Sequence, residues 1–333
     1  MVDFSDTESS TLYENTEDEI EVNIPISLTD PIEAVMKPEN LLDKFVEVGG
    51  RHYLNDDTLK SLKYYLPSDQ KEVKRTYDRH FVDKTVWGGN YSAPVSDSLS
   101  LGGASVLDVG CGAGAWIMNM ASDYPASIFV GIDIAPLFPE DYPPNMAFLN
   151  CNIMDGLPFP DNTFDFVRQA FVIICINWRS WKEKVVKELI RVTKPGGYIE
   201  IMDIQREIVN PGIISGKIDA YLEEHFYKAG INRASRAGVI DTFNEFKDEV
   251  IVSPIEEKTY YFGKKAGRIG EMTLKSIMEA YTAMKISFTH IMGITEKEFE
   301  QMLIDFEKEC NEVPLRKERY RAIIQKRSDA YGD

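Results

Sequence analysis

The sequence has few of the residues that would tie it to a metal, a disulfide framework or a membrane. It contains four cysteines and four histidines in 333 residues, all dispersed and without a C-x-x-C pair, which disfavours zinc. No apolar run reaches the roughly 18 residues of a membrane span. The acidic N-terminus lacks the basic region and apolar core of a signal peptide. We therefore expect reduced thiols in an intracellular protein, cytoplasmic or alternatively nuclear.

Basic residues are also scarce. Lys and Arg number 37 against 54 Asp and Glu, for a formal charge of −17. Residues 1–43 carry −11 of this charge, so the other 290 residues carry only −6. Neither part offers the basic stripe that non-specific nucleic-acid binding needs. We expect no nucleic-acid and no membrane partner, whereas a small-molecule substrate or a protein partner stays open.

The remaining composition, 44% hydrophobic, is that of a folded protein. Residues 1–43 are polar and acidic with little periodicity, which favours a disordered tail over a docking peptide. From residue 44 onward we expect one domain without repeats or linkers. Its parts are a helical segment, a core and a C-terminal half of the fold, at residues 44–95, 96–204 and 205–333.

One stretch, SVLDVGCGAGAW at residues 105–116, is the first positive indication of function. Residues 105–109 suit a buried strand, three glycines follow, and an apolar run from 115 to 120 suits the start of a helix. Such a turn lets the backbone approach a nucleotide-like ligand, and the helix N-terminus supplies N–H donors. The glycines also fit G-x-G-x-x-G/A, so a dinucleotide dehydrogenase stays open at this point.

The following segments alternate between strand and helix patterns, which predicts a parallel sheet with helices on both faces. Strands are predicted at residues 127–132, 147–152, 164–176, 198–202, 250–262 and 319–326. Helices are predicted at residues 183–192, 218–227, 271–287 and 296–309.

The segment before the glycine loop, residues 44–95, is rich in aromatic and charged residues and should hold two or three helices. Asp69 can cap one of them, with Glu72 close behind as in a capping box. Apolar side chains follow at helical spacing, at Val73, Tyr77 and Phe81. This position in the chain suits a lid over the ligand, and ordinary packing is the alternative.

Two acids give the loop a chemical character. Asp133 ends the strand at 127–132, 23 residues beyond Gly110, close to the roughly 20 expected for an acid that binds ribose hydroxyls. Burying it unpaired would be costly, which favours a ligand bond over a helix cap. Asp108 lies two residues before Gly110, where a pyrophosphate gains nothing from it. It suits a ligand with an ammonium group and argues against a dehydrogenase.

Four motifs in succession carry a resemblance: DVGCGAG, GIDI, NIMDGLPFPDNTFDFV and RVTKPGGYIEI. They are similar to the motifs of class I S-adenosylmethionine-dependent methyltransferases over residues 100–204. The flanks RHY, YLPSDQKE, EEKTYYFG and GRIGEM resemble the fungal LaeA-like (UMTA-type) methyltransferases, whose named relative is a nuclear regulator of secondary metabolism. The resemblance implies an α/β Rossmann-like three-layer sandwich. Its sheet would have seven mostly parallel strands with an antiparallel last strand, under an N-terminal helical lid.

The resemblance also implies how S-adenosyl-L-methionine would bind at its methionine end. The backbone of the glycine turn and the carboxylate of Asp108 would hold this end. The turn consists here of Gly110, Cys111, Gly112 and Gly114.

At the adenosine end, the resemblance implies that Asp133 takes the ribose hydroxyls and that Ile134 lies beside the adenine. Asn152 would accept a hydrogen bond from the adenine amino group through its side-chain oxygen. Ile153 would offer its backbone N–H to the ring, and Gln169 would border the place where the methyl group meets its acceptor.

Methyl transfer is a displacement whose main requirements are alignment of the reactants and exclusion of water. The reaction alone therefore does not specify the type of a catalytic residue. A general base is required only if the acceptor must lose a proton. His80 is the first candidate base, followed by His52 and Tyr53, with packing or surface roles as the alternative. No N/D-P-P-Y/F follows the fourth strand, which disfavours methylation of adenine or glutamine amino groups.

The sequence thus predicts a methyltransferase acting on a small molecule, without a metal. A regulatory protein that keeps the cofactor fold and acts through protein partners is the alternative, and a nicotinamide-dependent oxidoreductase is a distant third.

Overall fold

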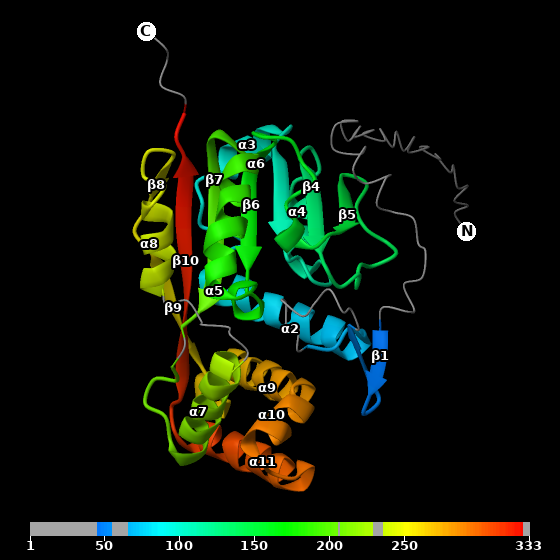
Figure 1. Ribbon diagram of the computed structural model, residues 1–333, viewed down its shortest axis with the longest axis vertical. Coiled ribbons are helices and arrows are strands. Elements are labelled where there is room, and N and C mark those ends of the chain that lie inside the picture. The colour runs from blue at the N-terminus through cyan, green and yellow to red at the C-terminus, as the bar shows by residue number, and fades with distance from the viewer. Residues whose placement is uncertain (1–44, 55–65, 206, 229–235, 329–333) are drawn as a thin grey trace, which may run out of the picture.

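The computed structural model describes residues 45–54, 66–205, 207–228 and 236–328. The predicted acidic tail lies outside the described residues, as does part of the predicted helical segment. Within the described part, a sheet with helices on both faces stands above a cluster of helices, and one long helix lies between them (Figure 1).

The central sheet has eight strands. Its order is β5-β4-β3-β6-β7-β10-β8, and β9 also pairs with β10. The parallel strands are β3 (Ser105–Val109), β4 (Ile128–Asp133), β5 (Met146–Asn150), β6 (Phe164–Ala170) and β7 (Thr193–Ile204). The antiparallel part comprises β10 (Arg316–Lys326), β8 (Val250–Val252) and β9 (Glu256–Tyr261). This strand order confirms the Rossmann-like fold class and its antiparallel last strand.

Two predicted strands differ from the structure. The strand expected at 250–262 is divided into β8 and β9 around Pro254, which has no N–H to donate to a ladder; the sheet therefore has eight strands instead of seven. The strand expected to continue to residue 176 ends at Ala170. Phe171 turns the chain there with a φ of 59°, a conformation outside the strand region.

Side-chain alternation along the strands builds a core on each face of the sheet. One face packs on α3 (Ser96–Leu101) and α4 (Ala115–Asp123), with Val106 and Phe166 in the core. The other packs on α5 (Trp178–Ser180), α6 (Val186–Val192) and α8 (Arg236–Asn244), with Leu107 and Val167 in the core. All five residues of β3 are buried, as expected for a central strand.

The helical cluster consists of α7 (Ile213–Lys228), α9 (Gly267–Ala283), α10 (Lys285–Met292) and α11 (Glu296–Glu312). It encloses a second apolar core that includes Leu222, Phe288 and Phe306. α11 begins with a complete capping box between Thr295 and Glu298. The helix predicted at 271–287 is two helices, since α9 ends at Ala283. No helix in the described ranges is both long and apolar enough to cross a bilayer.

The segment before the sheet contains a hairpin where helices were expected. β1 (Phe45–Val48) and β2 (Arg51–Leu54) pair across Gly49 and Gly50, which have φ angles of 60° and 72°. α2 (Gln70–Trp87) follows and begins at Asp69, whose side chain accepts from two backbone N–H groups as predicted. α2 lies across the edge of the sheet where the parallel strands end, the carboxyl edge (Figure 1).

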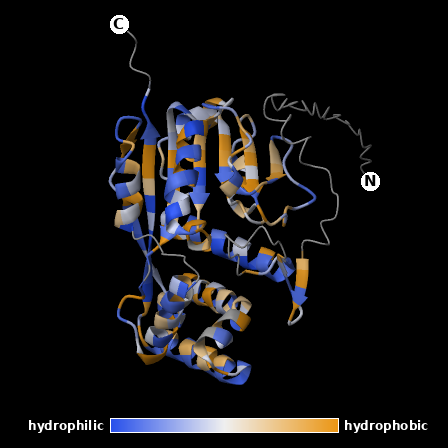
Figure 2. Cartoon of the chain, viewed as in Figure 1, coloured by the Kyte–Doolittle hydropathy of each residue, from blue (hydrophilic) through white to orange (hydrophobic). Residues whose placement is uncertain are grey.

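The face that α2 buries is charged, which reverses the expected orientation. Tyr77 and Phe81 are 38% and 48% exposed, so the apolar stripe points outward. Glu72, Arg75 and Asp83 are buried instead. Glu72 closes no capping box, because its carboxylate is held by Arg75. Figure 2 shows α2 coloured mostly hydrophilic beneath the hydrophobic strands.

Buried ion pairs attach β10 to its surroundings. Lys317 pairs with Asp219 of α7 at 2.9 Å, and Arg319 pairs with Asp83 of α2. The Tyr260 hydroxyl on β9 also donates to Asp83, at 2.7 Å. Farther along, Arg321 lies 3.4 Å from the Glu200 carboxylate of β7. β10 thereby connects α2, the helical cluster and the sheet, and it places α2 over the carboxyl edge.

Candidate functional site

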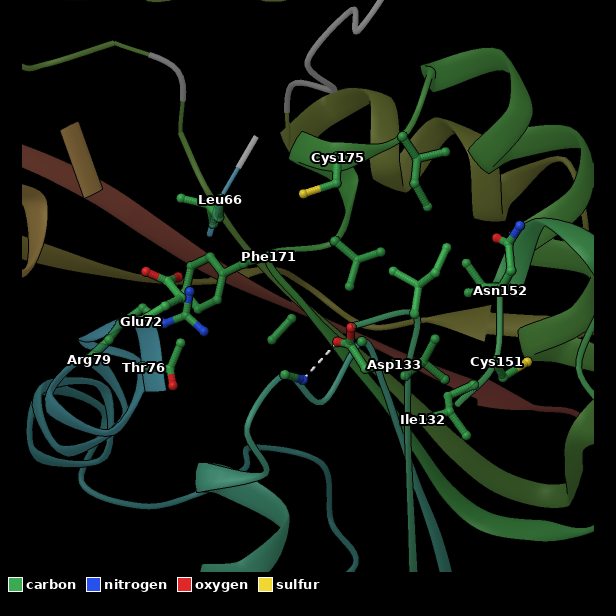
Figure 3. A pocket seen from close by; sticks show the side chains of 18 of the residues that line it. Leu66, Glu72, Thr76, Arg79, Ile132, Asp133, Cys151, Asn152, Phe171 and Cys175 are labelled. Atoms are coloured by element: carbon green, nitrogen blue, oxygen red, sulfur yellow. Dashed lines mark hydrogen bonds between the residues drawn. The ribbon is translucent and has the colours of Figure 1, made fainter. Parts of the chain in front are cut away.

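A cavity lies between the carboxyl edge of the sheet and α2 (Figure 3). We call it the first cavity. It holds about 860 Å³ of empty space counted together with its opening. Its walls come from α2 and from the loops after β3, β4, β5 and β6. Open α/β sheets bind ligands at this edge.

The glycine turn after β3 forms the floor of the first cavity. Gly110, Gly112 and Gly114 have φ angles of 74°, 57° and 78°, in the region that favours glycine. A Cβ on Gly110 would lie 2.3 Å from Val172, and one on Gly114 would lie 2.5 Å from the Phe148 ring. A Cβ on Gly112 would meet nothing within 4 Å. Gly112 thus leaves backbone open to a ligand, while the other two glycines permit close packing.

Gly110 and Gly112 line the first cavity, whereas Gly114 and Cys111 do not. The ring of Phe148 covers Gly114 from the side of β5. Burial, together with the charges of Asp133 and Asp108, raises the pKa of the Cys111 thiol well above its ordinary value. Cys111 is therefore a neutral packing residue at physiological pH.

Asp133, at the end of β4, brings a carboxylate to the first cavity. One oxygen accepts a hydrogen bond from the N–H group of Gly112 at 2.8 Å (Figure 3). The other accepts from the N–H group of Ala135, also at 2.8 Å. Burial raises its pKa to about 6, although these backbone bonds oppose the shift. Each carboxylate oxygen has a further lone pair. The side chain can therefore hold the glycine turn and still accept bonds from ligand hydroxyls.

The wall beside Asp133 contains Ile134, Asn152 and Ile153, for which the sequence predicts contacts with the adenine. Asn152 also caps a short 3-10 turn, Ile153–Asp155, because its side-chain oxygen accepts from the Met154 N–H at 3.0 Å. The oxygen expected to meet an adenine amino group is thus already shared. A second lone pair is left for a ligand.

Asp108 does not line the first cavity, contrary to the expected contact with a ligand. It is 1% exposed, and one oxygen accepts from Arg168 on β6 at 2.9 Å. The Arg168 guanidinium also lies 4.3 Å from the Trp116 ring. Arg168 thus supplies a positive charge to Asp108 in place of a ligand, while the second carboxylate oxygen of Asp108 has no hydrogen-bond partner among the described residues.

Gln169 also does not line the first cavity, although the sequence predicted it beside the reacting methyl group. It is completely buried and accepts a hydrogen bond from the Trp181 indole N–H at 2.6 Å. Strand alternation points Arg168 and Gln169 toward opposite faces of the sheet, away from its edge. Ala170, Phe171 and Val172 occupy the border of the first cavity instead.

None of the three candidate bases lines the first cavity. His80 Nε2 lies 3.3 Å from the Asn119 side-chain oxygen on α4, and burial lowers the pKa of His80 to about 4. His52 is exposed on β2. The Tyr53 hydroxyl donates to the Ala283 carbonyl at 2.8 Å. A catalytic base at these positions is therefore not supported.

Sequence reasoning missed the contribution of α2 to this wall. Glu72, Arg75, Thr76 and Arg79 all line the first cavity. Counted from Glu72 they stand at i, i+3, i+4 and i+7, so they share one face of the helix, and that polar stripe was readable from the sequence. The apolar periodicity of α2 predicted instead that the opposite face of the helix is buried.

A second cavity lies between the hairpin, α2 and α9 to α11, with about 1400 Å³ of empty space including its opening. Tyr53 lines this cavity. Glu72 and Arg75 line both cavities, and their two hydrogen bonds measure 2.8 and 2.5 Å. The ion pair is thus a shared wall. No group of three or more His, Cys, Asp or Glu in the described ranges could hold a metal ion.

In a comparison with known proteins, a family model described as a methyltransferase domain matches residues 106–197 of this chain. The N-methyltransferase verN of Clonostachys rogersoniana is 30% identical over 162 residues, 45% of this chain and 54% of that protein. The secondary metabolism regulator laeA of Coprinopsis cinerea is 30% identical over 176 residues, 51% of this chain and 42% of that protein. The chain spans about half the length of the curated relatives it matches.

Among solved structures, a SAM-dependent methyltransferase from Aquifex aeolicus is 20% identical, with a TM-score of 0.37 over 57% of this chain and 93% of that one. The fold described above rests on the strand order of this chain itself.

Proposed function

We propose that this chain, whose class I methyltransferase domain is similar to those of fungal N-methyltransferases and LaeA-like regulators, binds S-adenosyl-L-methionine in the first cavity and methylates a small molecule. The observation that carries the proposal is the pairing of open backbone at Gly112 with the Asp133 carboxylate, which accepts its N–H. A nucleoside with free ribose hydroxyls suits this pairing.

The other residues of the cavity fit the same cofactor. Ile134 and Ile153 offer apolar walls for a flat base, and Asn152 offers a polar side chain beside them. Phe171, Val172 and Cys175 line the opposite wall. These side chains would exclude water and align the reactants, which is the main task in methyl transfer.

When bound, the cofactor supplies an electrophilic methyl group on a sulfonium. Among the described residues that line the first cavity, the carboxylates are Glu72 and Asp133, and both already have partners. Burial raises the pKa of the Cys175 thiol to about 12, so this thiol is neutral. We therefore propose an acceptor that attacks with its own lone pair, such as an uncharged amine, and loses its proton afterwards.

The regulatory alternative is favoured by one specific observation, the similarity to a relative named as a secondary metabolism regulator. In that case the domain would bind the cofactor and act through protein partners, in the nucleus. For the enzyme we propose the cytoplasm, supported by four cysteines without disulfides. That nucleic acids and membranes are not partners stays a prediction.

Ligand-dependent thermal unfolding tests the proposal. S-adenosylhomocysteine at 100 times its Kd should stabilise the protein by about 2.7 kcal/mol, whereas NAD should not. Asp133→Ala and Gly112→Val should abolish this effect. Gly50→Val is the matched control, because Gly50 also has a positive φ and nothing within 4 Å of a Cβ but lies in the hairpin. Stabilisation by NAD alone would contradict the proposal.

Labelled methyl transfer separates the two alternatives. Incubation with labelled cofactor and a cell extract should place label in the small-molecule fraction if the protein is an enzyme. Binding of S-adenosylhomocysteine without any transfer would favour the regulator.

A further inference from the structure

Among the buried and partly buried arginines of the described residues, Arg79 faces the first cavity without a carboxylate partner. Four arginines in the described ranges are buried, and each has an acid within ion-pair distance. The pairs are Arg75–Glu72, Arg168–Asp108, Arg319–Asp83 and Arg321–Glu200. Arg79 of α2 is partly buried and lines the first cavity. It has no ion pair and no side-chain hydrogen bond to any described residue.

The surroundings of Arg79 favour an anion as its missing partner. Its guanidinium lies 4.3 Å from the Phe171 ring. Burial and the charge of Arg75 lower its pKa to about 10, although the charge of Asp83 opposes the shift. Arg79 therefore stays charged at neutral pH in a site where an unpaired charge is costly. An anionic ligand group would remove that cost.

The backbone at Phe171 strengthens this interpretation. Its φ of 59° is an outlier for a bulky residue, and such strain is typical of ligand sites. The strained turn sets the aromatic ring against Arg79, so the guanidinium has a fixed platform. Figure 3 shows Arg79, Thr76 and Phe171 on one side of the cavity and Asp133 and Asn152 on the other.

We propose that Arg79, held against Phe171, binds the carboxylate of the methionine portion of the cofactor. This inference rests on the proposed function, since Asp133 would take the ribose at the opposite side. It concerns the carboxylate of the methionine portion and not the ammonium group expected at Asp108, which already pairs with Arg168. α2 would thus recognise the amino-acid end of the ligand by its negative group.

Two ligands that differ only in that end test the proposal. S-adenosylhomocysteine carries the carboxylate, whereas 5′-methylthioadenosine keeps the nucleoside and thioether and lacks the amino-acid arm. Calorimetry should show that Arg79→Gln weakens S-adenosylhomocysteine about 10–100-fold, the scale of a hydrogen bond to a charged group. Binding of 5′-methylthioadenosine should be unchanged. Arg79→Lys, which keeps the charge, should give an intermediate loss.

Lys74→Gln is the matched control, because it removes the same charge from α2 on a side chain outside the first cavity. It should leave both affinities unchanged. Circular dichroism and the Tm report whether each variant folds. If Arg79→Gln does not fold, the native protein still decides the matter: decarboxylated S-adenosylhomocysteine should bind about 10–100-fold more weakly than the intact ligand.

The contrary outcomes are distinct. If the native protein binds S-adenosylhomocysteine and Arg79→Gln binds it equally well, the inference is wrong and the proposed function stands. An equal loss for both ligands would mean that Arg79 only shapes the cavity, which also overturns the inference. Unchanged cofactor binding with weaker binding of an acidic acceptor would assign the anion to the acceptor instead. A native protein that binds neither ligand would contradict the proposed function itself.

Discussion

α2 and α11 are nearly equal in length, 18 and 17 residues, and they bury opposite kinds of side chain. α11 buries Phe299, Leu303, Phe306 and Cys310, as an amphipathic helix on an apolar core should. α2 buries Glu72, Arg75 and Asp83 together with Val82, and exposes aromatic residues. A helix that only packs thus follows apolar periodicity, whereas α2 departs from it where it lines the first cavity.

The strongest test of this comparison is Phe306→Ala on the inward face of α11. Phe306 is fully buried in the second core, so its truncation should lower the free energy of unfolding by about 3–5 kcal/mol. Urea denaturation measures the loss, and Ile304→Ala, on the exposed face of the same helix, is the control. The affinity of the folded variant for S-adenosylhomocysteine should stay the same, and a changed affinity would show that α11 also serves the ligand site.

The inward face of α2 should be nearly as important for stability, although it is polar. Asp83→Asn removes the negative charge that pairs with buried Arg319, and the expected loss is about 3 kcal/mol. An amide oxygen can still accept the Tyr260 hydroxyl bond, so the charge is the main change. A loss below about 0.5 kcal/mol in the same denaturation experiment would mean that the buried charges of α2 do not hold it in place.

Ligand affinity should depend on pH through Asp133, whose pKa is raised to about 6 by burial. Between pH 7.5 and pH 5 the carboxylate gains a proton, and the affinity for S-adenosylhomocysteine should fall about tenfold. His80, with a pKa of about 4, and Cys175, with a pKa of about 12, titrate outside this range. Asp133→Asn should bind weakly with a flat profile, and an unchanged slope in this variant would assign the titration elsewhere.

The sign for stability is opposite in the ligand-free protein. Because the pKa of Asp133 is higher in the folded state than its ordinary value of 3.8, the folded state prefers the protonated acid. The contribution of Asp133 to stability is therefore largest below about pH 4 and is lost as the pH rises to about 6. Asp133 thus contributes less to the stability of the ligand-free protein at the pH where the affinity for S-adenosylhomocysteine is expected to be highest.

The smallest effect is expected on the outward face of α2. Phe81→Gln replaces a side chain that is 48% exposed, so the free energy of unfolding should change by about 0.5 kcal/mol or less. A loss above about 2 kcal/mol in urea would mean that this face is covered in the intact protein. The contrast between α2 and α11 would then disappear.

Local patterns explain what the sequence could predict. The positions of Gly110 and Gly112 and the acid after β4 follow from short motifs, and the helices of the C-terminal half follow from apolar period. Glu72 was misinterpreted because a capping box and an ion pair with Arg75 use the same spacing. No local pattern could indicate the pair between Asp83 and Arg319, which lie 236 residues apart in the chain.

The parts of the candidate site that the backbone of local motifs forms could be predicted from the sequence. The parts that depend on side-chain pairs between distant residues could not. The sequence indicated that Asp108 was free to bind a ligand, because no local pattern predicts its ion pair with Arg168, 60 residues later in the chain. Phe171 looked like ordinary strand because the left-handed region is rare for phenylalanine. Arg79 differs from the buried arginines in lacking an acidic partner among the described residues, which no local sequence pattern indicates.

The alternating cations of β10 also favour its native register against β7 during folding. Lys317, Arg319 and Arg321 point to one face and meet acids on three different elements, α7, α2 and β7. Sliding β10 by one residue against β7 would turn Glu318 and Tyr320 toward those acids and leave all three carboxylates uncompensated. The ion pairs thus disfavour folds in which β10 is misaligned. They also couple the correct register of β10 to the correct position of α2 over the first cavity.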